Sequence, residues 1–515
     1  MNRKNLVMMM ASALVWTALA SSTGFACYAV VAGRDATADG SVLFAHSELN
    51  FGRRFLNFRV VPGMNHEPGA MIRLFHGGAY PDVRESYSFI WSENFGMRGS
   101  DTYVNEWGVA CASDGTRTRE DSRDELIERG DIEDGGIGYQ LRHQVARRAK
   151  TAREGVLIAG ELIERFGYNF GGVTLVIADP NEAWMLSMAR GRHWVAQRVP
   201  DDEVVVLANV NIIGEVDLED STRFIASPDL IEYAVKRGWY DPENGEPFHY
   251  KKAYESPGKG WFETKYGCDA RQWRGQCLVT GEDIPLPVKE TLPFSVKPNR
   301  KLTVRDMRDI LSDHLEGTDF DKSKAYESGS PHDGMNSGDG CICSQYNQEV
   351  AVFQLRNGLP PEVGCVYWRT TGASCSGVLT PWYIGIIETP ESYYRQSGLK
   401  ENLNLEFHFN PPPETYDYDP EKAFWIFNAL ENLVDLDYKK HITNVRAVWK
   451  DYEAMEFEMQ PAVEQAALKL LEMDTALGRE FLTLYSSSLA LEAVKKAEKM
   501  VHELRTRVLW TLSAF

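Results

Sequence analysis

The chain has 515 residues, of which 43% are hydrophobic and 25% charged, and its formal net charge is −19. This is the composition of an ordinary globular protein, with enough apolar residues for one large domain or two of average size. The charge argues against nucleic acid as a partner, because phosphates repel an acidic surface and no basic stripe compensates. Beyond the N-terminal segment, no apolar stretch is long enough to span a bilayer.

Residues 1–26 have the pattern of a secretory signal peptide. Charged residues at 2–4 precede an apolar run over about 6–20, and Gly24 and Ala26 supply the small side chains that signal peptidase requires at positions −3 and −1. We therefore expect this segment to be removed. The product would be periplasmic or secreted, without stable insertion into the membrane.

Cleavage after Ala26 makes Cys27 the first residue of the mature chain. The residue then carries a thiol nucleophile and a free α-amine, whose pKa of ~7.7–8.0 allows it to accept a proton at working pH. This is the design of an N-terminal nucleophile hydrolase. Two alternatives are a structural disulfide and a lipid anchor. Lipidation signals usually have Leu at −3 and a small residue at −2, where this chain has Gly24 and Phe25.

The chain contains eight cysteines, so an odd number remains once Cys27 is set aside. Cys111 lies in an apolar run and is predicted to be a buried thiol. Because export permits disulfides, we expect some among the remaining six: Cys268, Cys277, Cys341, Cys343, Cys365 and Cys375. The Cys341-x-Cys343 pair resembles half of a zinc site, but no second Cys or His pair stands at ligand spacing, so we expect no metal.

The first predicted elements are strands. Short apolar runs bounded by turn residues indicate strands at 28–33, 41–45, 55–61, 87–91 and, with a tight turn inside it, 103–110. Helical spacing of apolar residues then predicts helices over 138–150 and 152–166. Strands return at 173–178, 183–188, 204–208, 350–355 and 364–368. This order favours an α+β fold in which a sheet is layered with helices.

Two later regions differ from this pattern. Residues of about 235–345 are polar, aromatic and rich in turn formers, which predicts a loop-rich insertion. Three consecutive prolines at 411–413 mark a break, and apolar stripes at helical spacing follow to the end of the chain. We expect 411–515 to form a helical region packed on the core.

Several short motifs resemble one peptidase family. The segment Cys27-Tyr-Ala-Val-Val-Ala-Gly-Arg-Asp-Ala-Thr-Ala-Asp-Gly-Ser41 is similar to the start of the cysteine dipeptidases related to lactobacillal dipeptidase A and the secernins. Stretches at 105–110, 151–154, 206–209 and 364–368, the last leading to Pro-Trp-Tyr at 381–383, agree in the same order. The resemblance implies an N-terminal nucleophile fold over 27–410, an αββα sandwich, and hydrolysis of dipeptides without a cofactor.

The resemblance also implies roles for single residues. Cys27 resembles the nucleophile. Asn105, in an Asn-Glu-x-Gly turn, and Asn209, which ends a Val-Leu-x-Asn strand, resemble the asparagines of the oxyanion hole in related bile-salt hydrolases. Arg223, in Thr-Arg-Phe, resembles an arginine near the nucleophile. A cation there would stabilise the thiolate by lowering its pKa.

One stretch departs from the family pattern. Many relatives carry Arg-Asn-x-Asp after the second strand, where this chain has His46-Ser47-Glu48-Leu49. His46 could replace the arginine and Glu48 the aspartate, or neither could, and the sequence leaves this open.

The leading hypothesis is an exported cysteine dipeptidase that acts on small peptides. One alternative keeps the fold and hydrolyses N-acyl amides, such as bile salts or penicillins. Another is an exported binding or envelope protein that has lost catalysis, which the departure at residues 46–49 favours. Whether the chain forms a homo-oligomer is left open as well.

Overall fold

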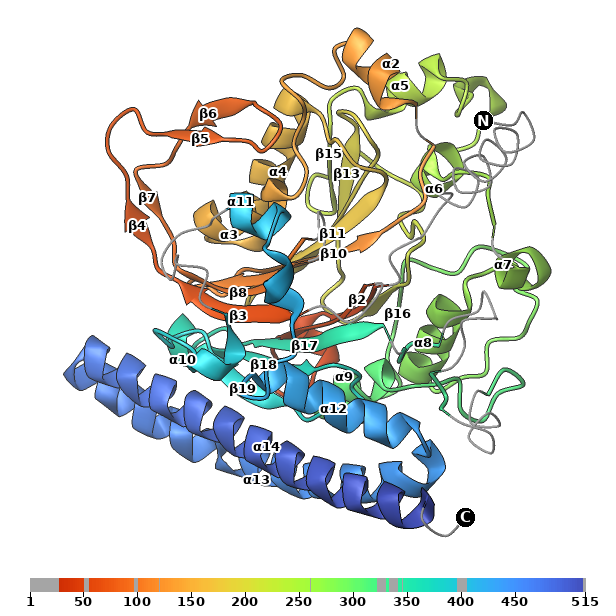
Figure 1. The fold of residues 1–515 in the computed structure, drawn as a ribbon. Coiled ribbons are helices and arrows are strands. Elements are labelled where there is room, and N and C mark those ends of the chain that lie inside the picture. The colour runs from red at the N-terminus through yellow and green to blue at the C-terminus, as the bar shows by residue number, and fades with distance from the viewer. Residues whose placement is uncertain are drawn as a thin grey trace, which may run out of the picture.

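The computed structural model describes residues 27–50, 55–96, 101–119, 121–259, 261–321, 330–332, 341–344, 346–395 and 405–512. Two antiparallel sheets face each other, and helices cover the outer face of each sheet (Figure 1). The expected αββα sandwich of the α+β class is therefore confirmed. The signal-peptide prediction for residues 1–26 lies outside the described residues.

The first sheet contains the start of the described chain. Its hydrogen-bonded order is β16 (Ser295–Val296), β14 (Val204–Leu207), β1 (Tyr28–Ala32), β2 (Val42–Leu49), β17 (Asn347–Leu355), β18 (Cys365–Thr371) and β19 (Thr380–Tyr383). Both β1 and β2 are buried along their whole length. The turn between them follows the prediction, because Gly40 adopts φ 76° and the side chain of Asp39 accepts a hydrogen bond from Ser41 N at 3.2 Å.

The second sheet is built mainly from consecutive strands. Its order is β15 (Phe224–Ala226), β13 (Trp194–Arg198), β12 (Ala183–Met188), β11 (Val173–Ala178), β10 (Ala110–Gly115), β9 (Thr102–Asn105), β8 (Phe89–Asn94) and β3 (Leu56–Val61). The chain between β3 and β8 forms two separate strand pairs. These are β4 (Met64–Asn65) with β7 (Glu85–Ser86), and β5 (Met71–Arg73) with β6 (Ala79–Pro81).

Two predicted helices cover the second sheet. They are α3 (Gln140–Arg148) and α4 (Ala152–Phe166), which pack on β9 to β13. Helix α4 begins where Thr151 accepts a hydrogen bond from Glu154 N at 3.1 Å, and it ends at Gly167, whose φ is 76°. Its apolar side joins a buried cluster with β10, β11 and β12.

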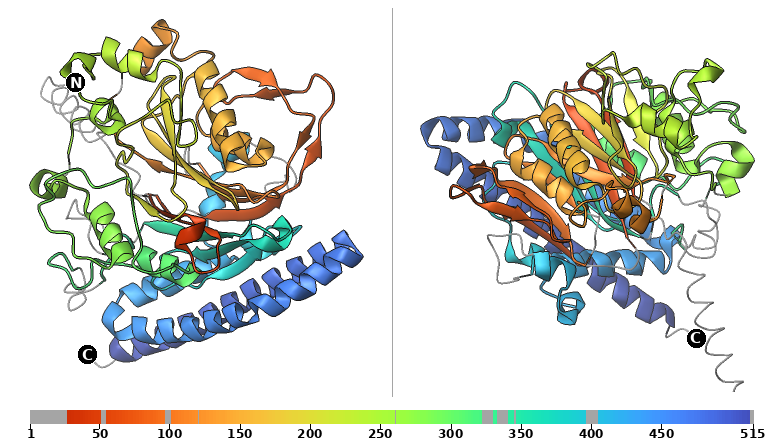
Figure 2. Two further views of the ribbon diagram at one scale, coloured as in Figure 1. Left: turned by 180° about the vertical axis from the view of Figure 1, so that it is seen from behind. Right: turned by 90° about the horizontal axis from the view of Figure 1, so that it is seen from above.

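The helices on the first sheet come from the second half of the chain. Helix α8 (Ala270–Thr280) packs near β14 and α9 (Val304–Leu311) near β2 and β17, while α12 (Ala423–Asp435) and α14 (Thr475–Leu512) contact β18 and β19. Helix α13 (Tyr438–Met473) lies along α14 as a long antiparallel pair (Figure 2). None of the helices in the described part of the chain is both long and apolar enough to cross a membrane.

The region of about 235–345 contains more helix than the sequence analysis predicted. It holds α6 (Tyr250–Tyr254), α7 (Trp261–Tyr266), α8 and α9. Asp269 caps α8, and a capping box of Thr303 with Asp306 begins α9. These local signals favour helix, and they outweigh the turn-rich composition between them. The remaining helices are α2 (Arg123–Glu128), α5 (Leu230–Lys236), α10 (Pro361–Gly364) and α11 (Leu405–Phe409).

All eight cysteines are buried free thiols, so the expected disulfides among the later six are wrong. The cysteines are distributed over several parts of the core. Cys111 packs under α4, as the buried thiol that was predicted, whereas Cys268, just before α8, and Cys277, within α8, share another cluster. Cys343, Cys365 and Cys375 belong to the large core around the first sheet.

Candidate active site

Cys27 lies directly before β1 and is only 2% exposed. Ala29 pairs with Leu207 on β14 and with His46 on β2. Continuing this register by two residues places Cys27 between Asn209 and Glu48. The side-chain contacts are consistent with this register, because Cys27 Sγ lies 3.4 Å from Glu48 Oε1 and 3.8 Å from the carbonyl oxygen of Leu49.

The site faces the second sheet. His46 stands two residues before Glu48 and therefore shares its face of β2. The Nε2 atom of His46 lies 3.6 Å from Oδ1 of Asp114, at the end of β10. In the same layer, Ser92 of β8 donates a hydrogen bond of 2.7 Å to Glu349 of β17. The nucleophile candidate thus lies between the sheets, at one end of the sandwich.

Arg271, near the start of α8, joins the two strands that flank the site. Its Nη1 donates to the carbonyl oxygen of Cys27 at 3.3 Å, and its Nη2 donates to Oδ1 of Asn209 at 2.8 Å. Its own carbonyl oxygen accepts a hydrogen bond from the Tyr28 hydroxyl at 3.2 Å. Because Asp269 caps α8 at this end, the position of the guanidinium follows from the start of the helix.

Asn209 is the predicted oxyanion asparagine that the structure brings to Cys27. It has φ 55°, a left-handed conformation that asparagine tolerates better than most residues. Its Nδ2 donates to the carbonyl oxygen of Gly115 at 2.8 Å. An amide nitrogen carries two hydrogens, so a second N–H of Asn209 remains for another acceptor.

The site holds buried ionisable groups with shifted pKa values. Burial, and then the charges of Glu48 and Asp114, raise the pKa of the Cys27 thiol well above its ordinary value. Burial raises the pKa of Glu48 to about 7 and also raises the pKa of Asp114. For His46, burial favours the neutral ring, but the Asp114 carboxylate 3.6 Å away raises its pKa overall. The thiol is therefore held in its protonated form in this structure.

Several polar atoms of this site are buried and lack a hydrogen-bond partner among the described residues. They are both ring nitrogens of His46, Oε2 of Glu48 and both carboxylate oxygens of Asp114. Such atoms are rare in folded proteins because each costs desolvation energy. Those around Cys27 lie close together, so a polar ligand at this place could bond several of them at once. Cys27, His46 and Glu48 also bring donor atoms within 4.8 Å of one another, a trio that could hold a cation as well.

Asn105 is the predicted oxyanion residue that the structure does not bring to Cys27. Its Oδ1 accepts hydrogen bonds from the backbone of Trp107 and Val109 at 3.0 Å each. Its Nδ2 donates to the carbonyl oxygens of Ala146 and Ala149 at 3.0 and 2.7 Å. The amide thus holds the β9–β10 turn against α3.

The β9–β10 turn also lies at the end of the sandwich opposite Cys27. A Cβ atom on Gly108 would stand 2.6 Å from Sγ of Cys365, so the turn packs against the first residue of β18. Cys365 pairs with Leu355, whereas Glu349, which pairs with Glu48, lies at the other end of β17.

Arg223 is also not near the nucleophile candidate. It is exposed, precedes β15 at the edge of the second sheet, and places its guanidinium 5.4 Å from the ring centre of Phe224. The cation beside Cys27 is Arg271 instead.

The sequence analysis missed Arg271 and Asp114. Arg271 follows a capping aspartate and opens the helical run of α8, a signal hidden by the turn-rich region around it. Asp114 is the second-last residue of β10, and the strand residues before it are small and buried. A carboxylate in such a strand is unusual, and this was the available signal.

The chain resembles known peptidases over most of its length. The model of Peptidase family C69 matches residues 26–451. A probable dipeptidase of Latilactobacillus sakei is 25% identical over 438 residues, which cover 81% of this chain and 85% of that protein. Dipeptidase A of Lactobacillus helveticus is 25% identical over 439 residues, covering 80% and 82%. The penicillin V acylase structure from Agrobacterium tumefaciens covers 67% of this chain and 82% of that one, at 11% identity and a TM-score of 0.33. The chain belongs to peptidase family C69, and it is a peptidase.

Proposed function

We propose that this chain is an exported dipeptidase in which Cys27 is the nucleophile and forms a thioester with the substrate. One observation carries the proposal: Cys27 stands at the head of β1, with Glu48 3.4 Å from its sulfur and Arg271 bonded to its carbonyl oxygen. The relatives named dipeptidase support the substrate class.

Cleavage after Ala26 is the first step of the proposal. It frees the α-amine of Cys27, which then accepts the thiol proton directly or through a water molecule. In the uncleaved chain, burial together with the charges of Glu48 and Asp114 holds the thiol pKa high, and the resulting ammonium offsets those charges. The family match begins at residue 26, next to this cleavage site.

The thiolate of Cys27 then attacks the carbonyl carbon of the dipeptide. The second N–H of Asn209 is available to the oxyanion that forms, a contribution typically worth about 10²–10³ in kcat. The C–N bond breaks, and the leaving nitrogen takes the proton held by the α-amine. Water hydrolyses the thioester and restores the free thiol.

The charges around Cys27 favour a substrate with a free amino group. Glu48 and Asp114 present three buried carboxylate oxygens that lack hydrogen-bond partners among the described residues. An α-ammonium group satisfies such oxygens, and it is present in every dipeptide with an unmodified N-terminus. An N-acyl substrate has no such charge.

A substrate panel tests the proposal with the purified mature protein. We expect hydrolysis of dipeptides with free N-termini, a strong loss for the same dipeptides after N-acetylation, and no turnover by Cys27→Ala. Penicillin V and a glycine-conjugated bile salt serve as comparison substrates. Turnover of these two without turnover of dipeptides would replace the proposal with the N-acyl amide hydrolase.

A further inference from the structure

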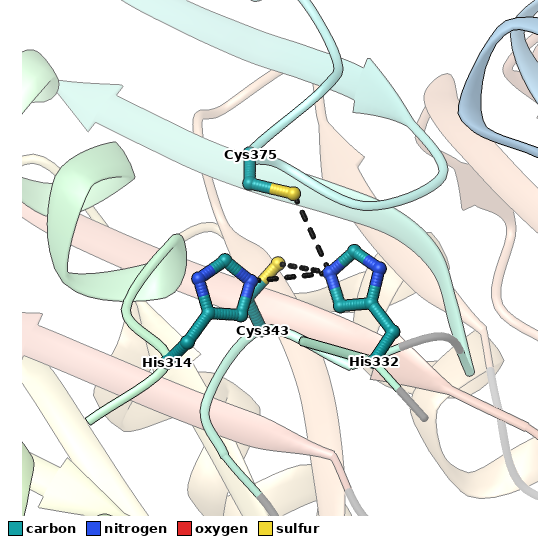
Figure 3. A group of neighbouring side chains, drawn as sticks. All are labelled: His314, His332, Cys343 and Cys375. Carbon is teal, nitrogen blue, oxygen red and sulfur yellow. Dashed lines mark hydrogen bonds between the residues drawn. The ribbon is translucent and has the colours of Figure 1, made fainter. Parts of the chain in front are cut away.

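A second group of ligand-type side chains lies outside the candidate active site. His314, His332, Cys343 and Cys375 are each at most 4% exposed, and one donor atom of each lies within 4.8 Å of all the others. Figure 3 shows the two imidazole rings and the two sulfur atoms pointing toward one another. The Nε2 atom of His332 lies 3.1 Å from Nε2 of His314, 3.6 Å from Cys343 Sγ and 3.4 Å from Cys375 Sγ.

The outer nitrogen of each imidazole contacts a carboxylate. Nδ1 of His314 lies 3.0 Å from Oε1 of Glu316, and Nδ1 of His332 lies 3.0 Å from Oδ1 of Asp435. A carboxylate at this position fixes the proton on Nδ1 and leaves Nε2 with its lone pair facing inward. Carboxylates oriented in this way are typical of histidines that bind metal ions.

The distances fit a tetrahedral zinc ion. Zinc binds nitrogen at about 2.0–2.1 Å and sulfur at about 2.3 Å. Around one tetrahedral centre, these bonds place two nitrogens about 3.3 Å apart and a nitrogen and a sulfur about 3.6 Å apart. The distances around His332 are 3.1 Å to nitrogen and 3.4 and 3.6 Å to sulfur. Each therefore lies within a few tenths of an ångström of its zinc value.

We propose that His314, His332, Cys343 and Cys375 bind one zinc ion in a closed structural site. Two thiolates and two neutral imidazoles in a tetrahedron select zinc among the common divalent metals. Four protein ligands leave no position for water or substrate, which distinguishes structural from catalytic zinc. The sequence analysis expected no metal because it required ligands in close pairs, whereas these four come from distant segments.

The site would connect the middle of the chain to the sheet and to the C-terminal helices. His314 follows α9, Cys343 precedes β17 and Cys375 follows β18, while Asp435 is the last residue of α12. One ion would thus join four connecting segments of the chain. We infer that the zinc stabilises the fold and takes no part in hydrolysis at Cys27.

Two other uses of the same side chains make different predictions. Cys375, His332 and Asp435 are arranged like a cysteine nucleophile with its base and acid. A catalytic triad of this kind gives no role to His314 and Cys343, although both lie close to Nε2 of His332. Alternatively, Cys343 and Cys375 could form a disulfide in an oxidising compartment.

Metal analysis of the purified full chain tests the proposal. We expect about one zinc ion per chain by inductively coupled plasma mass spectrometry. His332→Gln and Cys375→Ser should lose it. The matched control is Cys341→Ser, because Cys341 is buried two residues from Cys343 but donates its S–H to the carbonyl oxygen of Cys343 at 2.6 Å. This variant should keep its zinc.

A second measurement uses only the wild-type chain, in case the ligand variants do not fold. Removal of zinc with a chelator should lower the melting temperature, and Co²⁺ added in its place should give the visible absorption of a tetrahedral thiolate complex. Wild-type protein that neither contains zinc nor binds Co²⁺ in this way would overturn the proposal. So would a peptide map that finds Cys343 and Cys375 joined as a disulfide, or zinc retained by the folded Cys375→Ser variant.

Discussion

Cys27 and Cys375 are both buried beside a histidine and a carboxylate, yet their surroundings differ in one respect. Around Cys375, the donor atoms of His314, His332 and Cys343 converge on one point, and the outer atoms of both imidazoles contact carboxylates. Around Cys27, polar atoms of His46, Glu48 and Asp114 have no hydrogen-bond partner among the described residues.

This difference separates two kinds of polar site inside a protein. A closed set of donors needs only an ion at its centre, whereas an open set needs a larger ligand that brings its own hydrogen-bonding groups. The first suits a structural role and the second suits turnover.

The largest effect is expected for Cys27→Ala. Loss of the nucleophile should reduce dipeptide turnover by at least about 10³-fold, to the level left by binding and polar stabilisation alone. Cys375→Ala should keep its turnover per folded molecule and lose thermal stability instead. Steady-state kinetics and a melting curve for both variants separate the two roles. An equal loss of turnover in both variants would contradict the assignment of catalysis to Cys27 and of a structural role to Cys375.

The next effect concerns the two asparagines. Asn209→Ala should lower kcat by about 10²–10³ if its amide stabilises the oxyanion. Asn105→Ala should leave kcat of the folded enzyme unchanged, but each buried group that it leaves without a partner should cost about 1–3 kcal/mol of unfolding free energy. Kinetics and denaturant unfolding of both variants make the comparison. A large kcat effect at Asn105 would show that its turn acts on the site after all.

The charge of Glu48 should make stability depend on pH. Burial raises its pKa from 4.5 to about 7, so the folded chain favours the protonated form. The contribution of Glu48 to the free energy of unfolding is fully present below pH 4.5. It is lost as the pH rises through 7, and the total loss is about 3 kcal/mol. Glu48→Gln lacks this loss. Urea unfolding of the full chain from pH 4 to 8 should therefore show that the free energy of unfolding of Glu48→Gln rises relative to that of the wild type as the pH increases. A difference between the two free energies that does not change with pH would contradict the raised pKa of Glu48.

The smallest predicted effect concerns the two arginines. Arg271→Gln removes charge-assisted hydrogen bonds to Cys27 and Asn209 and should lower kcat/KM by about 10- to 100-fold. Arg223→Gln is the control: this exposed change should alter the free energy of unfolding by less than about 0.5 kcal/mol and leave kinetics unchanged. If Arg223→Gln lowers kcat/KM more than Arg271→Gln does, Arg271 is not the cation that supports Cys27.

The sequence predicts the strands of the site well and its distant contacts poorly. The β1–β2 hairpin follows from two short apolar runs and the Asp-Gly turn between them, and this hairpin brings Cys27, His46 and Glu48 together. Asn105 was misplaced because an Asn-Glu-x-Gly turn has the same sequence at either end of a sandwich. Only the packing of the two sheets decides which end carries the nucleophile.

The side chains that were missed depend on the same tertiary packing. Arg271 reaches Cys27 from a helix more than two hundred residues later in the chain, and no local pattern specifies that approach. The ligands of the proposed zinc site likewise come from segments that meet only after the sheet and α12 have assembled. Sequence spacing finds metal sites built from close pairs, and this one is not built in that way.

The most direct test is the intact mass of the protein recovered after expression of the full chain, measured before and after acid quenching of a reaction with a dipeptide ester. The account predicts a chain that begins at an unmodified Cys27 and gains the mass of one acyl group. Peptide mapping should place that group on the Cys27 sulfur. A chain that begins elsewhere, a lipid on Cys27, or an acyl group on another residue would contradict the account.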